Sequence, residues 1–235
     1  MNGSADLTAI DRRMVQVAPV DYQRSDLAEL FADIPVANIG DAMDRMGMCD
    51  AGVRAMWAGA KCVGTAFPIT VRAGDNAGLH VALEHIQAGD VLVVNGGGDL
   101  SRALLGDLLA TKLRRIGVTG VIIDGCIRDR STLEEMQYPV WARGSNPSGP
   151  YKNGPAIIGS AAAIGGVVVH PGDIIAADDD GVACIPADRA REILSSAHAI
   201  VANEAEMARQ AAGWLARSSF NSNQSLTSIT QRLGK

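Results

Sequence analysis

Two short apolar runs, residues 91–94 and 121–123, lie on either side of a glycine turn and a leucine-rich segment. Apolar runs of this length are typical of buried strands. The segment between them, residues 101–116, has leucines spaced as on one face of a helix. A strand, a helix and a second strand in this order can fold back on one another, so the ends of the two strands can meet.

The composition favours an α/β fold. The chain has 235 residues, of which 47% are hydrophobic, enough to bury a core. It contains 26 glycines and only 4% aromatic residues, which is typical of turn-rich α/β proteins with aliphatic cores. Further strands are predicted at residues 61–72, 140–142, 156–158, 167–169, 174–177 and 182–185. Helices are predicted at residues 26–34, 36–46 and 76–86, at a short segment after Ser131, and from about 187 to about 212.

We expect a single domain over residues 26–213, preceded by an N-terminal extension over residues 1–25. The tail, residues 214–235, is rich in serine and asparagine and is predicted to be flexible.

Charge, cysteines and hydropathy predict a soluble cytoplasmic protein. The net charge of −5 and the lack of basic runs argue against nucleic acid as a partner. The four cysteines are dispersed, which is typical of buried thiols in a reducing compartment. The N-terminus lacks the apolar region of a signal peptide. Glycines interrupt the longest apolar stretch, residues 156–169, which is too short to span a membrane.

Three charged residues surround the predicted strand–helix–strand unit: Asp107 near the helix, and the adjacent pair Arg128 and Asp129 after the second strand. Twenty residues separate Asp107 from Arg128, so the fold can bring the three together. A guanidinium at a strand end can bind a carboxylate through two hydrogen bonds. Asp129 could bind a hard cation such as Mg²⁺, which takes one or two carboxylates and fills its remaining positions with water and substrate oxygens.

Each of these residues also has an ordinary structural explanation. Arg128 could form an ion pair with Asp124 or Asp129, and Asp129 could cap the helix that follows at Ser131. Asp107 could be a solvated helix aspartate. If the helix begins near Gly106, free N–H groups at its N-terminus would face an anion; if it begins at Ser101, they would not, and the sequence slightly favours the latter.

Other kinds of active site find little support. None of the four lysines ends an apolar strand as a Schiff-base lysine would, and the four histidines form no zinc-binding cluster. Gly96–Gly98 is a weak nucleotide-binding signal because the G-x-G-x-x-G pattern is missing. The kind of active site that remains is a metal held by oxygen ligands beside an arginine.

Asp107, twenty intervening residues and the pair Arg128-Asp129 resemble the D-x20-R-D signature of the RraA-like family. This family includes aldolases of 4-hydroxy-4-methyl-2-oxoglutarate and 4-carboxy-4-hydroxy-2-oxoadipate. Further matches cover most of the chain in the same order, at residues 38–42, 74–76, 89–91, 144–147, 171–173 and 177–182.

The resemblance implies a compact α/β domain of the swivelling β/β/α kind with a long C-terminal helix, forming trimers or hexamers with active sites between subunits. It implies a class II pyruvate aldolase with Mg²⁺ or Mn²⁺ and with oxaloacetate decarboxylase activity. Asp129 would be the metal ligand, Asp107 would hold a metal-bound water, and Arg128 would bind substrate oxygens. Gly106, Asp107, Leu108 and Leu109 would contact the substrate carboxylate through their N–H groups, and Asn76 would line the pocket.

The resemblance leaves two further points open. The family also contains non-catalytic regulators that bind ribonuclease E, which is the alternative function. The C-terminal tail departs from the aldolase pattern, and either Glu204 or Glu206 could supply an acid to a neighbouring subunit, although glutamates on helix surfaces are usually only solvated.

Overall fold

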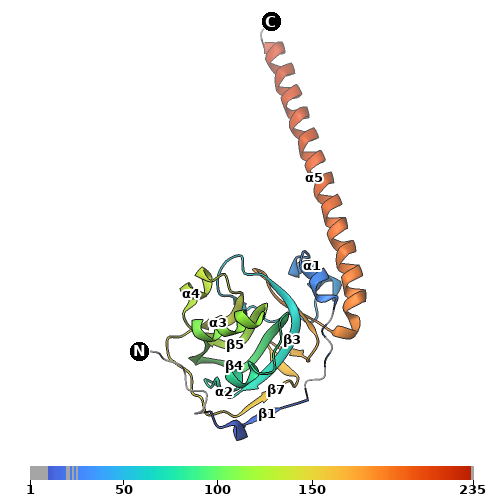
Figure 1. Cartoon of the computed structure of the whole chain (residues 1–235). Helices are drawn as coiled ribbons and strands as arrows, with labels where there is room; N and C mark the ends of the chain where they lie inside the picture. Colours follow the sequence, from blue (N-terminus) through green and yellow to red (C-terminus); the bar gives the residue numbers. More distant parts are fainter. Residues whose placement is uncertain (1–9, 20–21, 23, 25, 234–235) are drawn as a thin grey trace.

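Four parallel strands form the centre of the domain (Figure 1). They are β3 (Cys62–Val71), β4 (Asp90–Leu105), β5 (Gly120–Ile127) and β6 (Val140–Ser145), which are neighbours in this order. The structure, a computed structural model, describes residues 10–19, 22, 24 and 26–233, with side chains up to residue 211. The predicted α/β class is confirmed.

Short helices connect these strands in turn. α2 (Ala77–Ala82) joins β3 to β4, α3 (Asp107–Ile116) joins β4 to β5, and α4 (Arg130–Glu135) joins β5 to β6. Leu79, Leu109 and Leu133, one from each helix, belong to one buried cluster, so the three helices cover the same face of the sheet. This arrangement follows from the strong preference for right-handed crossovers between adjacent parallel strands.

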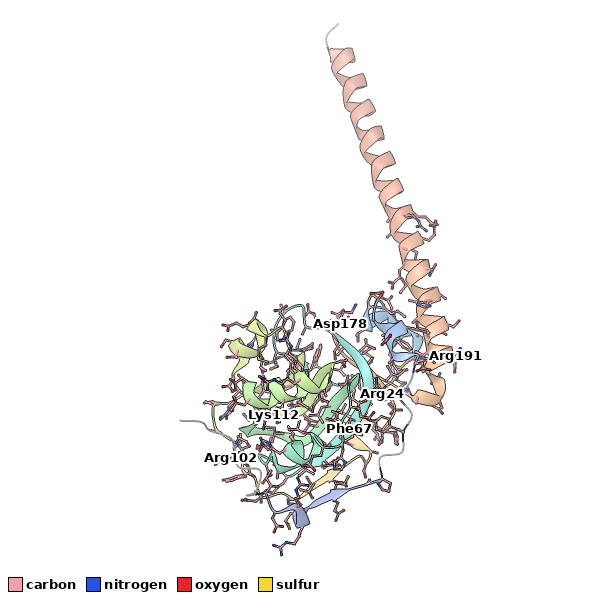
Figure 2. The ribbon with its side chains drawn as sticks, viewed as in Figure 1. Arg24, Phe67, Arg102, Lys112, Asp178 and Arg191 are labelled. Carbon is pink, nitrogen blue, oxygen red and sulfur yellow. The ribbon has the colours of Figure 1, made fainter. Side chains whose placement is uncertain are left out.

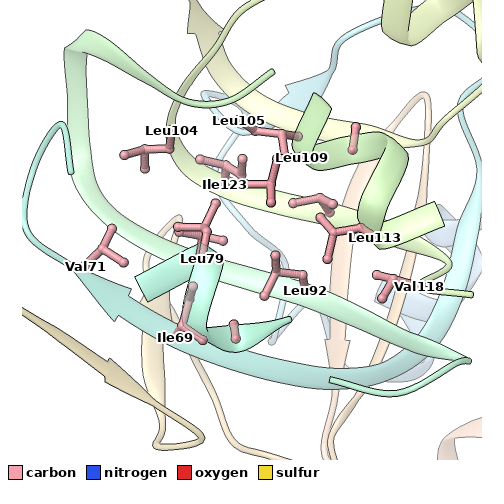
Figure 3. Packing of buried hydrophobic residues seen from close by; sticks show 14 of the residues in the cluster. Ile69, Val71, Leu79, Leu92, Leu104, Leu105, Leu109, Leu113, Val118 and Ile123 are labelled. Carbon is pink, nitrogen blue, oxygen red and sulfur yellow. The ribbon is translucent and has the colours of Figure 1, made fainter. Parts of the chain in front are cut away.

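Both faces of the central strands are buried, and their residues alternate accordingly. In β4, Leu92 and Val94 pack toward the helices, whereas Val91 and Val93 pack toward the opposite layer. Figure 3 shows the helix side, where Leu105 and Leu109 lie beside Ile123 of β5. Near-continuous aliphatic runs are therefore required here, as in other parallel sheets covered on both sides.

The opposite layer consists of β elements. The hairpin of β8 (Ala162–Ile164) and β9 (Val167–Val169) packs with Trp57 and Trp141 over this face. β10 (Ile174–Asp178) pairs antiparallel with the first half of β3 and with β11 (Gly181–Ile185). The domain thus has the predicted β/β/α layers.

A third cluster attaches the C-terminal helix. α1 (Val36–Ala42) and the 3₁₀ turn η3 (Ala28–Phe31) pack with α5 (Ala190–Leu233) on β10 and β11. Ile193 and Ala197 are buried in this cluster, but residues 202–211 of α5 are all exposed. Figure 1 shows α5 continuing away from the domain.

The remaining strands lie at the edges of the sheet. β7 (Ala156–Ile158) pairs with β3, and β1 (Val15–Val17) pairs parallel with β7. At the opposite edge, β2 (Arg54–Ala55) pairs with β6. The other 3₁₀ turns are η2 (Arg12–Met14) and η4 (Ala187–Arg189). Part of the expected N-terminal extension therefore belongs to the sheet, while the domain boundaries at residues 26 and 213 stay predictions.

Several predicted helices have different limits in the structure. The helix expected over residues 101–116 begins only at Asp107, because Ala103 and Leu105 continue β4 and pair with Cys126 and Ile127 of β5. Apolar spacing cannot distinguish a buried strand end from a helix start. Leu108, expected on the buried face, is exposed.

The other differences concern lengths. The helices predicted at residues 26–34, 36–46 and 76–86 are shorter, the first being a 3₁₀ turn, and strand β8 was missed. The final helix was expected to end near residue 212 but continues to Leu233. The flexibility of the tail stays a prediction. Among the described residues, no helix combines the length and apolarity needed to cross a membrane.

Candidate functional site

The carboxyl ends of β4 and β5 bring the two charged motifs together. Leu105, the last residue of β4, lies opposite Ile127, the last residue of β5. The Arg128 N–H donates to the Leu105 carbonyl over 2.9 Å, which fixes the two strand ends side by side. Gly106-Asp107 and Arg128-Asp129 follow directly, at the edge of a parallel sheet where α/β proteins bind ligands.

The Asp129 side chain faces α3 rather than its own helix. Asp129 occupies the N-cap position of α4, but its side chain makes no capping hydrogen bond there. Its Oδ2 instead accepts from the Asp107 N–H over 3.2 Å and lies 3.4 Å from the Arg128 Nε. The alternative that the Asp129 side chain caps α4 is therefore wrong. The Asp129 backbone is in the left-handed region, with φ of 59°, which is uncommon for a residue other than glycine.

Position 106 has no room for a side chain and therefore requires glycine. Its backbone is extended, so φ alone does not demand glycine. A Cβ on this residue would lie 2.5 Å from the Asp129 Oδ2 and 3.0 Å from the Arg128 Nε. Any side chain here would push the carboxylate and the guanidinium out of place.

α3 begins at Asp107, with Gly106 as its N-cap, so the alternative of a helix start near Gly106 is confirmed. The Leu108 N–H donates to the Asp107 Oδ1 over 2.7 Å. Among the described residues, the Leu109 N–H has no hydrogen-bond partner. Helix N-termini with free N–H groups favour anions.

A cavity of about 510 Å³ opens beside this helix start. Its wall contains Gly106, Leu108 and Leu109 from the start of α3, and Asn76 from the start of α2. The charged residues in the described part of its wall are all cations: Lys112, Arg115, Arg128 and Lys152. This charge favours a ligand carrying more than one negative group.

The motif carboxylates do not line the cavity itself. Asp129 is held next to two of its wall residues, Gly106 and Arg128, and Asp107 follows Gly106 in the chain. The structure therefore brings together the residues predicted for the site, whose roles stay predictions: Gly106, Asp107, Leu108, Leu109, Asn76, Arg128 and Asp129.

Two buried polar groups in the wall have no partner. Asn76 donates through Nδ2 to the Leu104 carbonyl over 3.1 Å, but its Oδ1 accepts nothing within the described structure. The Nδ1 of buried His80 is likewise unpaired there. Buried polar atoms are nearly always satisfied, so both are suited to a bound ligand or water. Burial, with added repulsion from Lys152 and Lys112, lowers the pKa of His80 to about 4, so its imidazole is neutral at pH 7.

Arg128 is not taken up by a structural ion pair with Asp124. Asp124 instead forms an ion pair with Arg143 and accepts from the Gly165 N–H. The one carboxylate in contact with Arg128 among the described residues is that of Asp129, at Nε. The two terminal nitrogens of the guanidinium make no hydrogen bond within the described structure, which leaves them for a substrate carboxylate.

The donors present suit a hard cation held mainly by water and substrate. Within the described residues, the second carboxylate oxygen of Asp129 has no hydrogen-bond partner, and a third of the side chain is exposed. In that part of the chain, no group of three or more His, Cys, Asp or Glu residues is arranged so that it could hold a metal ion by itself. A site of one or two carboxylates fits Mg²⁺ or Mn²⁺ and does not fit structural zinc.

Glu204 and Glu206 lie elsewhere, on α5. The Glu204 Oε2 accepts from the Asn38 amide over 2.7 Å, whereas Glu206 bonds Arg209 and Gln210. Neither lines the cavity of its own chain. A role of either residue in a neighbouring subunit stays a prediction.

Sequence reasoning missed the four titratable wall residues other than Arg128: His80, Lys112, Arg115 and Lys152. The signal for Lys112 was present, because it lies one helical turn beyond Leu108 and Leu109 once α3 is known to begin at Asp107. Arg115 follows Lys112 by three residues on the same helix. Lys152 lies on a loop whose course no local pattern predicts.

The family model described as RraA-like, Aldolase/RraA, matches residues 36–184 of this chain. A protein of Halalkalibacterium halodurans named "Putative 4-hydroxy-4-methyl-2-oxoglutarate aldolase" is 31% identical over 172 residues, 73% of this chain and 82% of that protein. A Pseudomonas aeruginosa protein of the same name is 38% identical over 112 residues, 48% of this chain and 69% of that protein.

Solved structures show the same fold. RraAS2 of Streptomyces coelicolor, described as an unusual member of the RNase ES inhibitor RraA protein family, has a TM-score of 0.71 and 28% identity. The comparison covers 81% of this chain and 99% of that one. The RNA-processing inhibitor RraA from Thermus thermophilus has a TM-score of 0.61 and 29% identity, covering 66% of this chain and 93% of that one.

The lowered pKa of His80 predicts a loss of stability on acidification. Between pH 6.5 and about 4 the unfolded chain binds a proton that the folded His80 does not, so stability falls as the pH drops through this window. When the pH is lowered from 7.5 to 5, the free energy of unfolding should fall in both proteins. The fall should be smaller in His80→Gln than in the wild type, by on the order of 1–2 kcal/mol. Urea denaturation at both pH values measures this. The exposed His198→Gln serves as the control, and equal losses in all three proteins would contradict the prediction.

Proposed function

The chain belongs to the RraA-like family, and from this we propose that it is a divalent-metal-dependent lyase that cleaves a 4-hydroxy-2-oxo acid to pyruvate and a second oxo acid. The substrate would be of the 4-hydroxy-4-methyl-2-oxoglutarate or 4-carboxy-4-hydroxy-2-oxoadipate type, with oxaloacetate decarboxylation as a side activity. The observation that carries the proposal is the meeting of Gly106-Asp107 with Arg128-Asp129 beside a cavity whose charged wall residues are all cationic.

Arg128 and the start of α3 would orient the pyruvyl part of the substrate. The terminal nitrogens of Arg128 can bind two oxygens in one plane. The Leu109 N–H faces the same anion from the helix start, and the Leu108 N–H joins it if the Asp107 side chain turns away. Holding the substrate at two points fixes the bond to be cleaved relative to the groups that stabilise charge.

Asp129 would hold Mg²⁺ or Mn²⁺, with Asp107 orienting a metal-bound water. When bound, the cation supplies Lewis-acid stabilisation of the negative charge that develops on the substrate's 2-oxo oxygen as the carbon–carbon bond breaks. The Asp107 N–H restrains the Asp129 Oδ2, which leaves the other oxygen directed to the ligand. Arg128, 3.4 Å from Asp129, holds this carboxylate in place.

The far part of the cavity would hold the second half of the substrate. Lys112, Arg115 and Lys152 supply positive charge there, and Asn76 and neutral His80 supply unpaired polar atoms. A substrate with a second carboxylate satisfies these groups, whereas pyruvate alone would leave them without a partner.

The second candidate is a non-catalytic regulator that binds ribonuclease E, and the likeness to the two RraA structures favours it. A regulator of this kind needs neither the metal nor the cationic cavity. Metal-independent binding of a ribonuclease E domain that survives Arg128→Ala, in a protein that releases no pyruvate, would favour this candidate over the lyase.

Replacing the proposed metal ligand should abolish turnover and leave the fold intact. Asp129→Asn keeps the side-chain volume and tolerates the left-handed backbone, but it loses the charge. Metal contributions of several kcal/mol correspond to a loss on the order of 10²-fold or more in kcat. Pyruvate release from oxaloacetate, coupled to lactate dehydrogenase, measures the rate, and the exposed Asp180→Asn is the matched control. Full turnover in Asp129→Asn, or in excess chelator, would exclude the metal site.

Arg128→Lys tests the two-point contact. Lysine keeps the charge and loses the planar fork, so kcat/KM should fall on the order of 10²-fold. Arg128→Ala should be worse, because Asp129 then loses its neighbour as well. A structural arginine would behave differently: the melting temperature would fall while turnover per folded molecule stayed normal. Kinetics and thermal unfolding on the same preparation separate the two cases.

The proposed function includes assembly into a trimer or hexamer. Residues 202–211 of α5 are all exposed, although Glu204 bonds Asn38 of α1, and this exposed surface supports contact with another subunit. Light scattering should therefore report three or six copies of the 24.5 kDa chain. A monodisperse and fully active monomer at micromolar concentration would contradict the shared active site.

A further inference from the structure

One wall of the cavity is a loop with no secondary structure of its own. Residues 148–153 run past the cavity, and Pro150 and Lys152 line it, whereas Tyr151 between them does not. Glycine, serine, proline and asparagine make up the rest of the segment, so the loop has little intrinsic rigidity. Its shape therefore depends on contacts with the neighbouring elements.

The backbone of the loop is tied to the residues around the candidate site. The Ala103 N–H donates to the Ser148 carbonyl over 2.9 Å. The Tyr151 N–H donates to the Gly74 carbonyl over 2.8 Å, and the Tyr151 carbonyl accepts from the Asn76 N–H over 2.9 Å. The position of Tyr151 is thus coupled to that of Asn76 in the wall.

Arg102 holds the outer side of the loop. Its Nη1 donates to the Gly149 carbonyl over 2.8 Å, and its Nη2 donates to the Tyr151 hydroxyl over 3.0 Å. Its guanidinium also stacks on the Tyr151 ring, 4.1 Å from the centroid. Arg72 lies over the same ring at 5.5 Å but is paired with Asp75. The planar guanidinium of Arg102 thus contacts the loop through two hydrogen bonds and one stacking contact, which a lysine could not reproduce.

Arg102 does not line the cavity, so its influence on a ligand must be indirect. Figure 2 shows Arg102 and Lys112 on the same side of the domain. Two wall residues depend on the gripped loop. Lys152 follows Tyr151 directly, and Gly149 lies so close to Arg128 that an added Cβ would be 3.4 Å from its Nη1.

We propose that Arg102, through Tyr151 and Gly149, is a positioning residue that fixes the 148–153 loop and thereby sets Lys152 for the anionic far end of the substrate. Its kinetic consequence rests on the proposed lyase function. Because Lys152 would meet a carboxylate that does not change charge in the reaction, its contact contributes equally to the ground state and the transition state. Loss of the contacts that Arg102 makes with the loop should then raise KM more than it lowers kcat.

The first test measures the loop itself. Hydrogen exchange of residues 148–153 should speed up by about tenfold in Arg102→Ala, since two charge-assisted hydrogen bonds are lost, while exchange in β5 stays unchanged. Arg102→Lys should behave like Arg102→Ala, and Tyr151→Phe, which keeps the stacked ring, should be milder. Arg114→Ala, which removes another arginine bonded to a backbone carbonyl, is the matched control. Unchanged exchange in the loop, or an equal loss of protection throughout the domain, would overturn the proposal.

The second test asks whether Arg102 acts through Lys152. Arg102→Ala should raise KM for 4-hydroxy-4-methyl-2-oxoglutarate, whose far carboxylate stays ionised through the cleavage, about tenfold with kcat changed less than about threefold, and Lys152→Ala should do the same. The double variant should then be no worse than Lys152→Ala alone, because both changes remove one contact. A KM increase in the double variant equal to the product of the two single increases would contradict the role of Arg102. So would a loss confined to kcat.

The two proposals fail in distinguishable ways. If the wild type releases no pyruvate, the lyase function fails. The positioning role of Arg102 is then judged from loop exchange and from the affinity for 2-oxoglutarate, which has a far carboxylate, measured by titration calorimetry. In that case Arg102→Ala and Lys152→Ala should each weaken 2-oxoglutarate binding, and the double variant should be no weaker than Lys152→Ala alone. A 2-oxoglutarate affinity that is unchanged in Arg102→Ala, while Lys152→Ala weakens it, would overturn the positioning role.

Discussion

The hydrogen bond between the Arg128 N–H and the Leu105 carbonyl is the contact on which the candidate site depends. It aligns the ends of two parallel strands, so that the residues following each strand emerge at the same point. Gly106 can then approach Asp129 so closely that a single added carbon would collide with the carboxylate. The start of α3, the Arg128 guanidinium and the Asp129 carboxylate are all placed by this one alignment, and the cavity opens beside them.

Charge is separated across the site in a way that the fold enforces. The carboxylates of Asp107 and Asp129 stay at the helix start, whereas the cations Lys112, Arg115 and Lys152 come from the body of α3 and from the 148–153 loop. Asp124, which could have neutralised Arg128, is instead occupied by Arg143. The cavity wall is therefore cationic, while the two carboxylates lie just outside it beside Arg128.

The sequence alone predicted the meeting of Asp107, Arg128 and Asp129, because their spacing fits one strand–helix–strand unit and the connection between parallel strands has one preferred hand. It misplaced the start of α3, because Leu104 and Leu105 satisfy a helical pattern as well as they satisfy the buried end of β4. It gave no sign of Lys152, whose position is set by contacts with Arg102, Gly74 and Asn76 that are distant in the chain. The sequence therefore predicts which residues meet within one strand–helix–strand unit. It does not predict the position of a loop that is held by residues distant in the chain.

The left-handed backbone of Asp129 limits which residues could ever replace it. At a φ of 59°, asparagine and aspartate are the residues with a Cβ that are most enriched, although Arg45 and Gln137 also have positive φ in this chain, and glycine carries no steric penalty. A library randomised at this codon would therefore be filtered first by conformation, before any chemistry is tested. Glutamate, the other carboxylate, would be disfavoured at that first step even though it could bind the same cation. The backbone geometry of this residue thus favours aspartate over glutamate as the carboxylate at this position.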